Sequence, residues 1–368
     1  MAEILAKDFL NVLIECSERA ARISRRCRLD GSLFPLLVEE KEGSDRFVQD
    51  FKTFADVLVQ QTIKFHIEKS YPELRQNIYG EENNEVRSID GKKVTLNITS
   101  SKEETSESLE QALGAERRKF LSCLLDDIFG PAETNVQALE VPDILKLQDV
   151  GIWIDPIDAT NEYVQGSEGI PSEVPGAYRS GLPCVTILIG VFSTVTHEPL
   201  IGVVNQPFIG APEDGYCSKI WWGLSIGGTK VNNLPNIHLN SPAKAAISSS
   251  ERPEIRKSLS DTFQLVEMAG AGYKILCTAL GLTDAFVLSK STTYKYDTCA
   301  PHALLLSQGG NLVELDGILD EKANSDTVDM QGYQVTYFSK TEKPYKNVHG
   351  LIGFVEGSIL LDVVDLLS

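Results

Sequence analysis

The chain has 368 residues, of which 42% are hydrophobic and 23% charged, a composition typical of folded globular proteins rather than disordered ones. Its 34 basic and 52 acidic residues give a net charge of −18, which disfavours nucleic acid or an anionic membrane as the main partner. The seven cysteines are scattered and the five histidines form no HExxH or HxH pair. We therefore predict reduced thiols and a cytoplasmic location, with no disulfide framework and no histidine-rich metal site.

The first half of the chain begins with two predicted helices. Apolar residues recur at helical spacing over residues 4–28 and again over 55–70, where Pro72 ends the pattern. A charged loop is expected between them at 39–50. A short strand at 77–79 then runs into Gly80-Glu81-Glu82. Residues 83–147 are polar and are predicted to form an excursion that contains a helix over 107–129.

The second half alternates short apolar runs with helical patterns. Three buried strands are predicted at 150–154, 184–192 and 199–204. Further strands are expected at 245–247, 285–288, 312–315 and 351–355, with helices at 253–260, 270–280 and 297–306. This alternation predicts a layered α/β fold. The longest apolar run is too short to span a bilayer.

Acidic residues are densest where the strand at 150–154 ends. Asp155 and Asp158 are three residues apart, with a proline between them, and a helix is predicted to begin just after Asp158. These two carboxylates and the carbonyl of Ile157 are hard oxygen donors, which suit Mg²⁺ or Mn²⁺ better than zinc. Backbone N–H groups at the helix start can meet a phosphate. Taken alone, the pattern is more typical of an Asp-Pro turn that caps a helix.

Three more acidic positions also lie at element ends. Glu81 and Glu82 follow a strand, Asp56 opens the second helix, and Asp297 opens the helix at 297–306. Each is individually explained by a solvated turn or a helix cap. The four positions together favour a shared metal site.

The ordered motifs identify a family resemblance. They are a Thr-x-x-Asp ending at Asp56, Gly80-Glu81-Glu82, Trp-Ile-Asp-Pro-Ile-Asp-x-Thr at 153–160, and aromatic-Asp-x-Cys-Ala at 296–300. This set resembles the lithium-sensitive, Mg²⁺-dependent phosphomonoesterases, which include inositol monophosphatase, fructose-1,6-bisphosphatase and the 3′-phosphoadenosine 5′-phosphate phosphatases. Within that superfamily, the stretches at 36–41, 50–60, 184–191, 205–208, 270–274 and 295–303 resemble the branch that acts on inositol polyphosphates.

The resemblance implies a fold and a metal site. The fold is a five-layer αβαβα sandwich with an N-terminal α+β lobe at 1–204 and a C-terminal α/β lobe at 205–368. It implies two or three Mg²⁺ ions, with Li⁺ and Ca²⁺ as inhibitors. The metal ligands it implies are Glu82, Asp155, Asp158, Asp297 and the carbonyl of Ile157. Asp56 and Thr160 would orient and deprotonate the attacking water, and Glu81 would hold a further metal-bound water.

The implied reaction is hydrolysis of the 1-phosphate of inositol 1,4-bisphosphate and inositol 1,3,4-trisphosphate. The expected substrate contacts are Ala159, Thr160, Ser249, Ser250, Arg252, Gly270, Ala271 and Lys274. Two residues depart from the family pattern. Ala159 stands where Gly or Ser is usual, and Tyr296 replaces the usual Trp.

Alternatives stay open at this point. One is the same chemistry on 3′-phosphoadenosine 5′-phosphate, and another is a non-catalytic sensor of inositol phosphates. The GxSxG match at 223–227 lacks a helical pattern after it and is predicted to be a glycine-rich turn. We expect His302 and the Trp221-Trp222 pair to be packing residues. The sequence indicates no obligatory protein partner, and a monomer is compatible with it.

Overall fold

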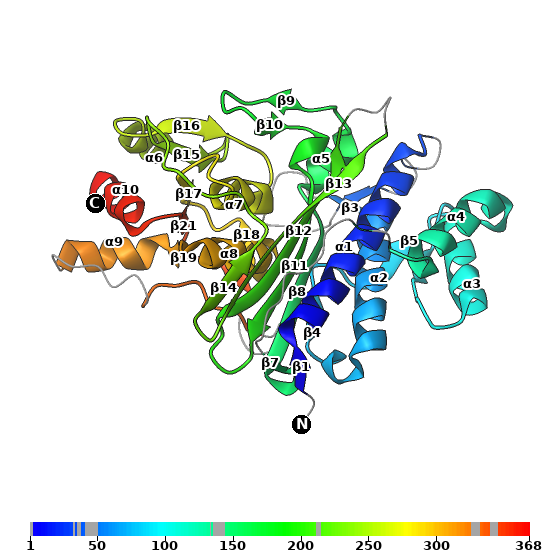
Figure 1. Cartoon of the computed structure of the whole chain (residues 1–368). Helices are drawn as coiled ribbons and strands as arrows, with labels where there is room; N and C mark the ends of the chain where they lie inside the picture. The colour runs from blue at the N-terminus through cyan, green and yellow to red at the C-terminus, as the bar shows by residue number, and fades with distance from the viewer. Residues whose placement is uncertain are drawn as a thin grey trace.

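The computed structural model describes residues 3–31, 34, 38–40, 51–132, 134, 144–210, 215–324, 332–338 and 345–368. In this part of the chain, two sheets and three layers of helices alternate (Figure 1). The expected five-layer αβαβα arrangement is therefore confirmed. Most of the predicted charged loop at 39–50 falls outside the described residues. No described helix combines the length and apolarity needed to cross a membrane.

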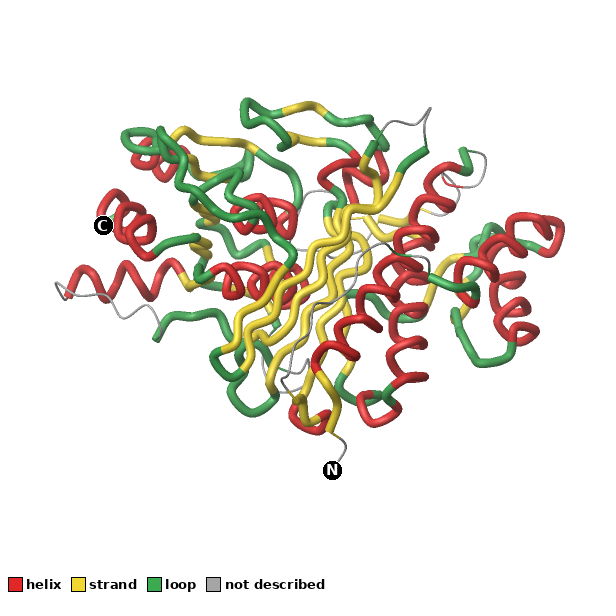
Figure 2. The backbone as a smooth tube through the Cα atoms, viewed as in Figure 1, coloured by secondary structure: helices red, strands yellow, loops and turns green. Residues whose placement is uncertain are grey.

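The first sheet has six strands in the order β14-β13-β12-β11-β8-β4. Figure 2 shows them as a central band with helices on both sides. The strands are β4 (Ile78–Gly80), β8 (Val150–Asp158), β11 (Thr186–Ser193), β12 (Pro199–Ile209), β13 (Cys217–Ile226) and β14 (Thr229–Asn232). Every residue of β8 and β11 is buried, as expected for strands covered on both faces.

The second sheet has five strands in the order β16-β15-β17-β21-β19. They are β15 (Lys244–Ile247), β16 (Gln264–Glu267), β17 (Ala285–Leu288), β19 (Asn311–Glu314) and β21 (Leu351–Phe354). Smaller two-stranded pairs surround the sheets: β1 (Glu3–Leu5) with β7 (Ile144–Lys146), β2 (Val38–Glu40) with β3 (Phe51–Thr53), β5 (Glu85–Arg87) with β6 (Lys93–Thr95), β9 (Ile170–Pro171) with β10 (Tyr178–Ser180), and β18 (Thr293–Tyr294) with β20 (Lys346–Asn347).

Helices form the other three layers (Figure 1). The first layer is α1 (Ala6–Leu29) with α2 (Phe54–Ser70), and it covers one face of the first sheet. The middle layer is α7 (Ala271–Ala279) with α8 (Lys295–Gln308), which lies between the two sheets. The third layer covers the second sheet and comprises α6 (Pro253–Leu259), α9 (Leu315–Asn324) and α10 (Gly357–Leu367). Three hydrophobic clusters fill the space between the layers: one lies between the first helical layer and the first sheet, one surrounds the middle helices and reaches both sheets, and one lies between the second sheet and the outer helices.

Three glycines let α8 approach the first sheet closely. Gly190, Gly202 and Gly223 lie side by side on β11, β12 and β13. A Cβ added at Gly190 would lie 2.5 Å from the backbone N of Ala300, and one at Gly202 would lie 2.1 Å from the Ala300 carbonyl oxygen. The row of glycines is therefore a groove in which the α8 backbone rests on the sheet.

Several sequence predictions need correction. The helix expected over 107–129 is two helices, α3 (Lys102–Leu113) and α4 (Arg118–Phe129), because Gly114 between them has φ +82° and ends the first. Short 3₁₀ helices occur at Pro72–Leu74, Ala115–Arg117, Leu147–Asp149 and Leu182–Cys184. The strand expected at 150–154 continues to Asp158, and β13 was missed altogether.

The GxSxG match lies on the β13–β14 hairpin, with Gly227 and Gly228 at the turn. No helix follows it, so it is not a nucleophile elbow, as predicted.

The first sheet extends across the predicted lobe boundary after residue 204. Residue 204 lies within β12, and the first sheet continues to Asn232. A lobe boundary after 204 therefore cuts through one sheet.

Candidate active site

A bulge in β8 brings Asp155 and Asp158 onto the same face of the first sheet. Residues three apart in a regular strand point to opposite faces. Here Asp155 pairs with Leu188 and Asp158 with Thr186, so three steps along β8 match two along β11. The Thr186 hydroxyl donates to Asp158 Oδ2 (3.2 Å), and the Ile157 N–H donates to Asp155 Oδ1 (3.2 Å). The extra residue thus converts an Asp-Pro-Ile-Asp spacing into a pair of neighbouring carboxylates.

Asp297 reaches this pair from the middle helical layer. It lies in the first turn of α8, and its carboxylate accepts the Tyr294 backbone N–H at 2.5 Å. Because the glycine groove holds α8 against the sheet, carboxylate oxygens of Asp155, Asp158 and Asp297 lie within 4.8 Å of one another. Their exposed fractions are 1%, 4% and 0%.

Three buried carboxylates this close together are costly unless a cation neutralises them, because burial and mutual repulsion both disfavour the ionised form. The donor set is all oxygen, which fits a hard divalent cation and excludes a preference for zinc. The cluster is therefore a candidate divalent-metal site. The sequence prediction that these three acids come together agrees with this geometry.

The start of α2 supplies a second acidic group. Thr53 caps the helix, and both its N–H (2.7 Å) and its hydroxyl donate to Asp56 Oδ2. One turn further along α2, Gln60 holds the backbone of Glu82 at both its N–H (2.9 Å) and its carbonyl (2.5 Å). Residues four apart share a helix face, so Asp56 lies on the side of α2 that contacts the end of β4. Lys52 forms an ion pair with Glu82, Nζ to Oε2 3.2 Å.

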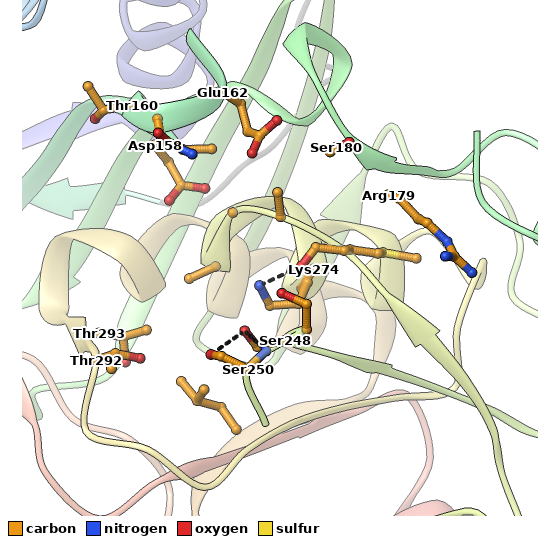
Figure 3. Close-up of a pocket in the computed structure, with 18 of the residues that line it drawn as sticks. Asp158, Thr160, Glu162, Arg179, Ser180, Ser248, Ser250, Lys274, Thr292 and Thr293 are labelled. Atoms are coloured by element: carbon orange, nitrogen blue, oxygen red, sulfur yellow. Dashed lines mark hydrogen bonds between the residues drawn. The ribbon is translucent and has the colours of Figure 1, made fainter. Parts of the chain in front are cut away.

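A cavity of about 700 Å³ adjoins the acidic cluster (Figure 3). Its lining includes the acids Asp155, Asp158 and Glu81, together with Lys274 and the serines at 248–250. Most predicted substrate contacts are among its lining residues: Ala159, Thr160, Ser249, Ser250, Gly270, Ala271 and Lys274. Ile157 also lines the cavity, and the Thr160 hydroxyl donates to its carbonyl at 3.0 Å. Four predicted site residues, Asp56, Glu82, Asp297 and Arg252, are not among the described lining residues.

The α7 start brings Lys274 beside the acids. A Cβ added at Gly270 or Gly272 would lie 3.0 Å from Asp158 Oδ2, so glycine permits this approach. The Lys274 side chain is buried, and its Nζ donates to the Met268 carbonyl at 3.2 Å. Burial lowers the pKa of Lys274, and the negative charge of Asp158 acts in the opposite direction. Lys274 therefore lines the cavity with an amine whose charged form is opposed by burial and favoured by Asp158.

Two positions that depart from the family pattern are accommodated differently. Ala159 lies in the left-handed region with φ 64° and ψ 46°, which favours glycine. Tyr296 is buried in an aromatic cluster, with its ring centroid 5.2 Å from that of Tyr294 and 6.2 Å from that of Trp153. The smaller aromatic ring is thus packed without loss of the cluster.

Some predicted residues lie outside the cavity lining, and some residues of the site were not predicted from the sequence. Arg252 donates to the Ser289 carbonyl at 2.7 Å, while the unpredicted Arg179 lines the cavity. His302 is buried between the Tyr337 hydroxyl (2.9 Å) and Asn311 Oδ1 (2.8 Å), a packing role as expected. Ser248, Glu162 and Gln60 were also missed, because their roles depend on contacts between elements distant in the sequence.

Comparison with known proteins now adds to this geometry. A model of the inositol monophosphatase family matches residues 10–341. The inositol polyphosphate 1-phosphatase of Mus musculus is 38% identical over 342 residues, which cover 86% of each chain. That of Homo sapiens is 40% identical over 339 residues, covering 85% of this chain and 84% of the human protein. The 3′(2′),5′-bisphosphate nucleotidase 1 of Homo sapiens is 26% identical over 309 residues, covering 82% of this chain and 81% of the nucleotidase.

Solved structures share the fold. The Thermotoga maritima IMPase has a TM-score of 0.52 and 17% identity, covering 98% of this chain and 96% of its own. The extragenic suppressor protein suhB of Bartonella henselae has a TM-score of 0.54 and 13% identity, covering 98% of both chains. The family match over most of the chain, the two close relatives and the clustered acids agree with one another. The chain belongs to the inositol monophosphatase family.

Proposed function

We propose that this chain is a Mg²⁺-dependent, Li⁺-inhibited phosphatase that removes the 1-phosphate from inositol 1,4-bisphosphate and inositol 1,3,4-trisphosphate. One observation carries the proposal: three buried carboxylates cluster together, and two of them, Asp155 and Asp158, line a cavity of about 700 Å³ that a buried lysine also lines. Relatives at 38% and 40% identity that bear the name inositol polyphosphate 1-phosphatase support the choice of substrate class.

The metal ligands that we propose are Asp155, Asp158, Asp297, Glu82 and the carbonyl of Ile157. The buried oxygen donors described above fit two or three Mg²⁺ ions. When bound, such ions neutralise charge on a phosphate and lower the pKa of coordinated water. Li⁺ and Ca²⁺ would inhibit by competing for the same oxygens. Glu81, which lines the cavity beside Asp155, would accept a hydrogen bond from a further water.

The chain's own groups would prepare the attack. Asp56 is the proposed general base, because Thr53 fixes its carboxylate and α2 holds it beside the Glu81–Glu82 corner. Thr160, held by the Ile157 carbonyl, would position the attacking water with it. The Ala159 backbone N–H faces the same cavity as the acids and would donate to a phosphate oxygen. Lys274 would balance the charge of a phosphate that is not cleaved.

The cavity lining favours an inositol phosphate over a nucleotide. Adenine is commonly held by stacking on an aromatic ring. None of the described residues that line this cavity is aromatic, whereas serine and threonine hydroxyls are abundant: Thr160, Ser180, Ser248, Ser249, Ser250, Thr292 and Thr293. A ring of hydroxyl and phosphate groups matches such a surface. 3′-Phosphoadenosine 5′-phosphate is the second candidate substrate because of the 26% identical nucleotidase.

Phosphate release with Mg²⁺ tests the proposal. We expect turnover of inositol 1,4-bisphosphate, suppressed by Li⁺, and little turnover of 3′-phosphoadenosine 5′-phosphate. Preference for the nucleotide would overturn the substrate assignment. Turnover of neither would overturn the enzymatic proposal and favour an inositol-phosphate sensor.

Removing one carboxylate tests the metal site separately. We expect Mg²⁺ to raise the melting temperature of the wild type but not that of Asp297→Asn, and phosphate release to fall by about 100-fold or more. Asp365→Asn is the matched control, since that carboxylate is exposed on α10 and pairs with Lys322. Equal Mg²⁺ shifts in the wild type and Asp297→Asn would refute the site.

The proposal also includes where the protein acts and in which oligomeric state. The seven cysteines are all free thiols, which supports a reducing compartment and hence the cytoplasm. Cell fractionation tests this. We also propose that the protein acts as a monomer, which light scattering tests.

A further inference from the structure

Arg179 places a second positive charge at the rim of the cavity. It lies on β10 and lines the cavity, with 44% of its side chain exposed. In Figure 3 it lies across the cavity from Asp158, on the far side of Lys274. Its guanidinium pairs with Glu173, whose side chain is 47% exposed. The pair therefore stands at the cavity mouth, on the side away from the acidic cluster.

The backbone on which Arg179 sits is fixed to the cavity walls. Its carbonyl accepts the Ala269 N–H at 2.8 Å, which ties it to the loop before α7. The preceding residue, Tyr178, donates its N–H to the Tyr273 hydroxyl at 3.0 Å. Two residues after Arg179, the Gly181 N–H donates to Glu162 on α5 (Thr160–Gln165). The Arg179 backbone is thus held in place, and its side chain is 44% exposed.

The acidic and basic residues that line the cavity suggest what Arg179 binds. The described lining carries five acids, Glu81, Asp155, Asp158, Glu162 and Glu267, against two bases, Arg179 and Lys274. A phosphate beyond the one at the metal site needs a base, and Lys274 supplies the nearer one. Glu81, Asp155 and Asp158 belong to the proposed metal site, so away from it the described lining carries Glu162 and Glu267, and Glu267 is paired with Arg256. Among the described lining residues, Arg179 is then the base left for a third phosphate. We propose that Arg179 is a specificity-determining residue that binds the third phosphate of a trisphosphate substrate.

In this proposal the Glu173 carboxylate competes with the substrate phosphate for the Arg179 guanidinium. An exposed ion pair contributes little free energy, so a substrate phosphate can replace the carboxylate at low cost. A guanidinium can also donate two parallel hydrogen bonds to a phosphate, which lysine cannot. Glu173 holds Arg179 at the rim until a phosphate arrives. The inference rests on the proposed function, since it concerns the same cavity and substrate class.

Steady-state kinetics of charge-removing variants test the role of Arg179. We expect Arg179→Gln to raise KM for inositol 1,3,4-trisphosphate by about 5-fold, the effect of one exposed charge pair, while kcat changes little. KM for inositol 1,4-bisphosphate should change by less than about 2-fold. We expect Glu173→Gln to lower the trisphosphate KM by about 2-fold, and this gain should vanish in the double variant.

The chain offers a control ion pair in Glu68, near the C-terminal end of α2, and Arg75, which follows the 3₁₀ turn after α2; their side chains are 29% and 74% exposed, with Nε to Oε2 3.6 Å. Arg75→Gln and Glu68→Gln should leave both KM values unchanged. Equal changes for both substrates, or none, in Arg179→Gln would overturn the inference while wild-type turnover left the proposed function standing. A wild type inactive on both substrates would overturn the proposed function, and this inference with it.

Discussion

The glycine groove under α8 predicts that one methyl group on the first sheet weakens metal binding. In Gly202→Ala, the new Cβ would lie 2.1 Å from the Ala300 carbonyl oxygen and 2.8 Å from Leu304 Cδ1. Ordinary contacts are about 3.5 Å or longer, so α8 must move by about 1 Å or more. Ala300 is one helical turn from Asp297, and the displacement therefore reaches this proposed metal ligand.

Gly202→Ala should lower both the stability of the fold and the rate of phosphate release, the rate more strongly. Overpacking of this kind costs about 1–3 kcal/mol of stability. A displacement of about 1 Å at a catalytic site costs about 100-fold in rate. We expect Gly202→Ala to fold, to unfold at lower urea concentration, and to need a much higher Mg²⁺ concentration for half-maximal phosphate release.

Gly223→Ala provides the graded comparison. Its added Cβ would meet the Ser307 hydroxyl at 2.4 Å, which can rotate away, and would lie 3.0 Å from Ser307 Cβ and 3.1 Å from Leu304 Cα, which is a milder clash with the α8 backbone than the 2.1 Å at Gly202. Ser307 is also ten residues beyond Asp297, about 15 Å along α8. We expect a smaller loss of stability and an unchanged Mg²⁺ requirement. If both variants shift the Mg²⁺ requirement equally, or neither does, the groove does not position Asp297 and the reasoning is wrong.

Three further predictions concern single residues. Ala159→Gly should raise the free energy of unfolding by about 1 kcal/mol, because it relieves the left-handed φ of 64°, and urea denaturation measures this. Lys274→Met should raise KM for inositol 1,4-bisphosphate by about 10-fold or more with its packing kept, and an unchanged KM would exclude a phosphate contact. Burial lowers the pKa of His302 from 6.5 to about 3, so the unfolded chain binds the extra proton below pH 6.5. Stability should fall as pH drops from about 6.5 towards 3, by at most about 1.4 kcal/mol per pH unit from this group, and His302→Gln should flatten that slope. His66, with a pKa lowered to about 4, adds to the same loss in both proteins and cancels in the comparison.

The sequence was sufficient for the layered fold and for the acids of the site, because the motifs lie at the ends of strongly patterned elements. It was not sufficient for how those acids meet. Regular strand periodicity puts Asp155 and Asp158 on opposite faces, and only the pairing with Thr186 and Leu188 reveals the bulge. Strand register is a long-range property that a local pattern does not contain.

The same limit explains why the sequence predicted Arg252 as a substrate contact and missed Arg179. Arg252 follows a strand and a run of serines, which locally resembles a phosphate-binding loop, yet its guanidinium is used by the Ser289 carbonyl. Arg179 has no such local signal. It lines the cavity only because β10 is tied to the loop before α7 through the Ala269 N–H. β13 was missed for a related reason, since its partners β12 and β14 supply the pairing that its own mixed pattern does not predict.

The proposed metal site depends on two close approaches as much as on its carboxylates. The α7 backbone reaches Asp158 where Gly270 and Gly272 leave no side chain, and α8 reaches the sheet where Gly190 and Gly202 do the same. Each approach brings a group that the acids on β8 need, Lys274 in one case and Asp297 in the other. A chain could therefore keep every acidic motif and still lose the site through a methyl group on either surface. The glycines are part of what specifies the chemistry, and the acidic motifs alone are an incomplete description of it.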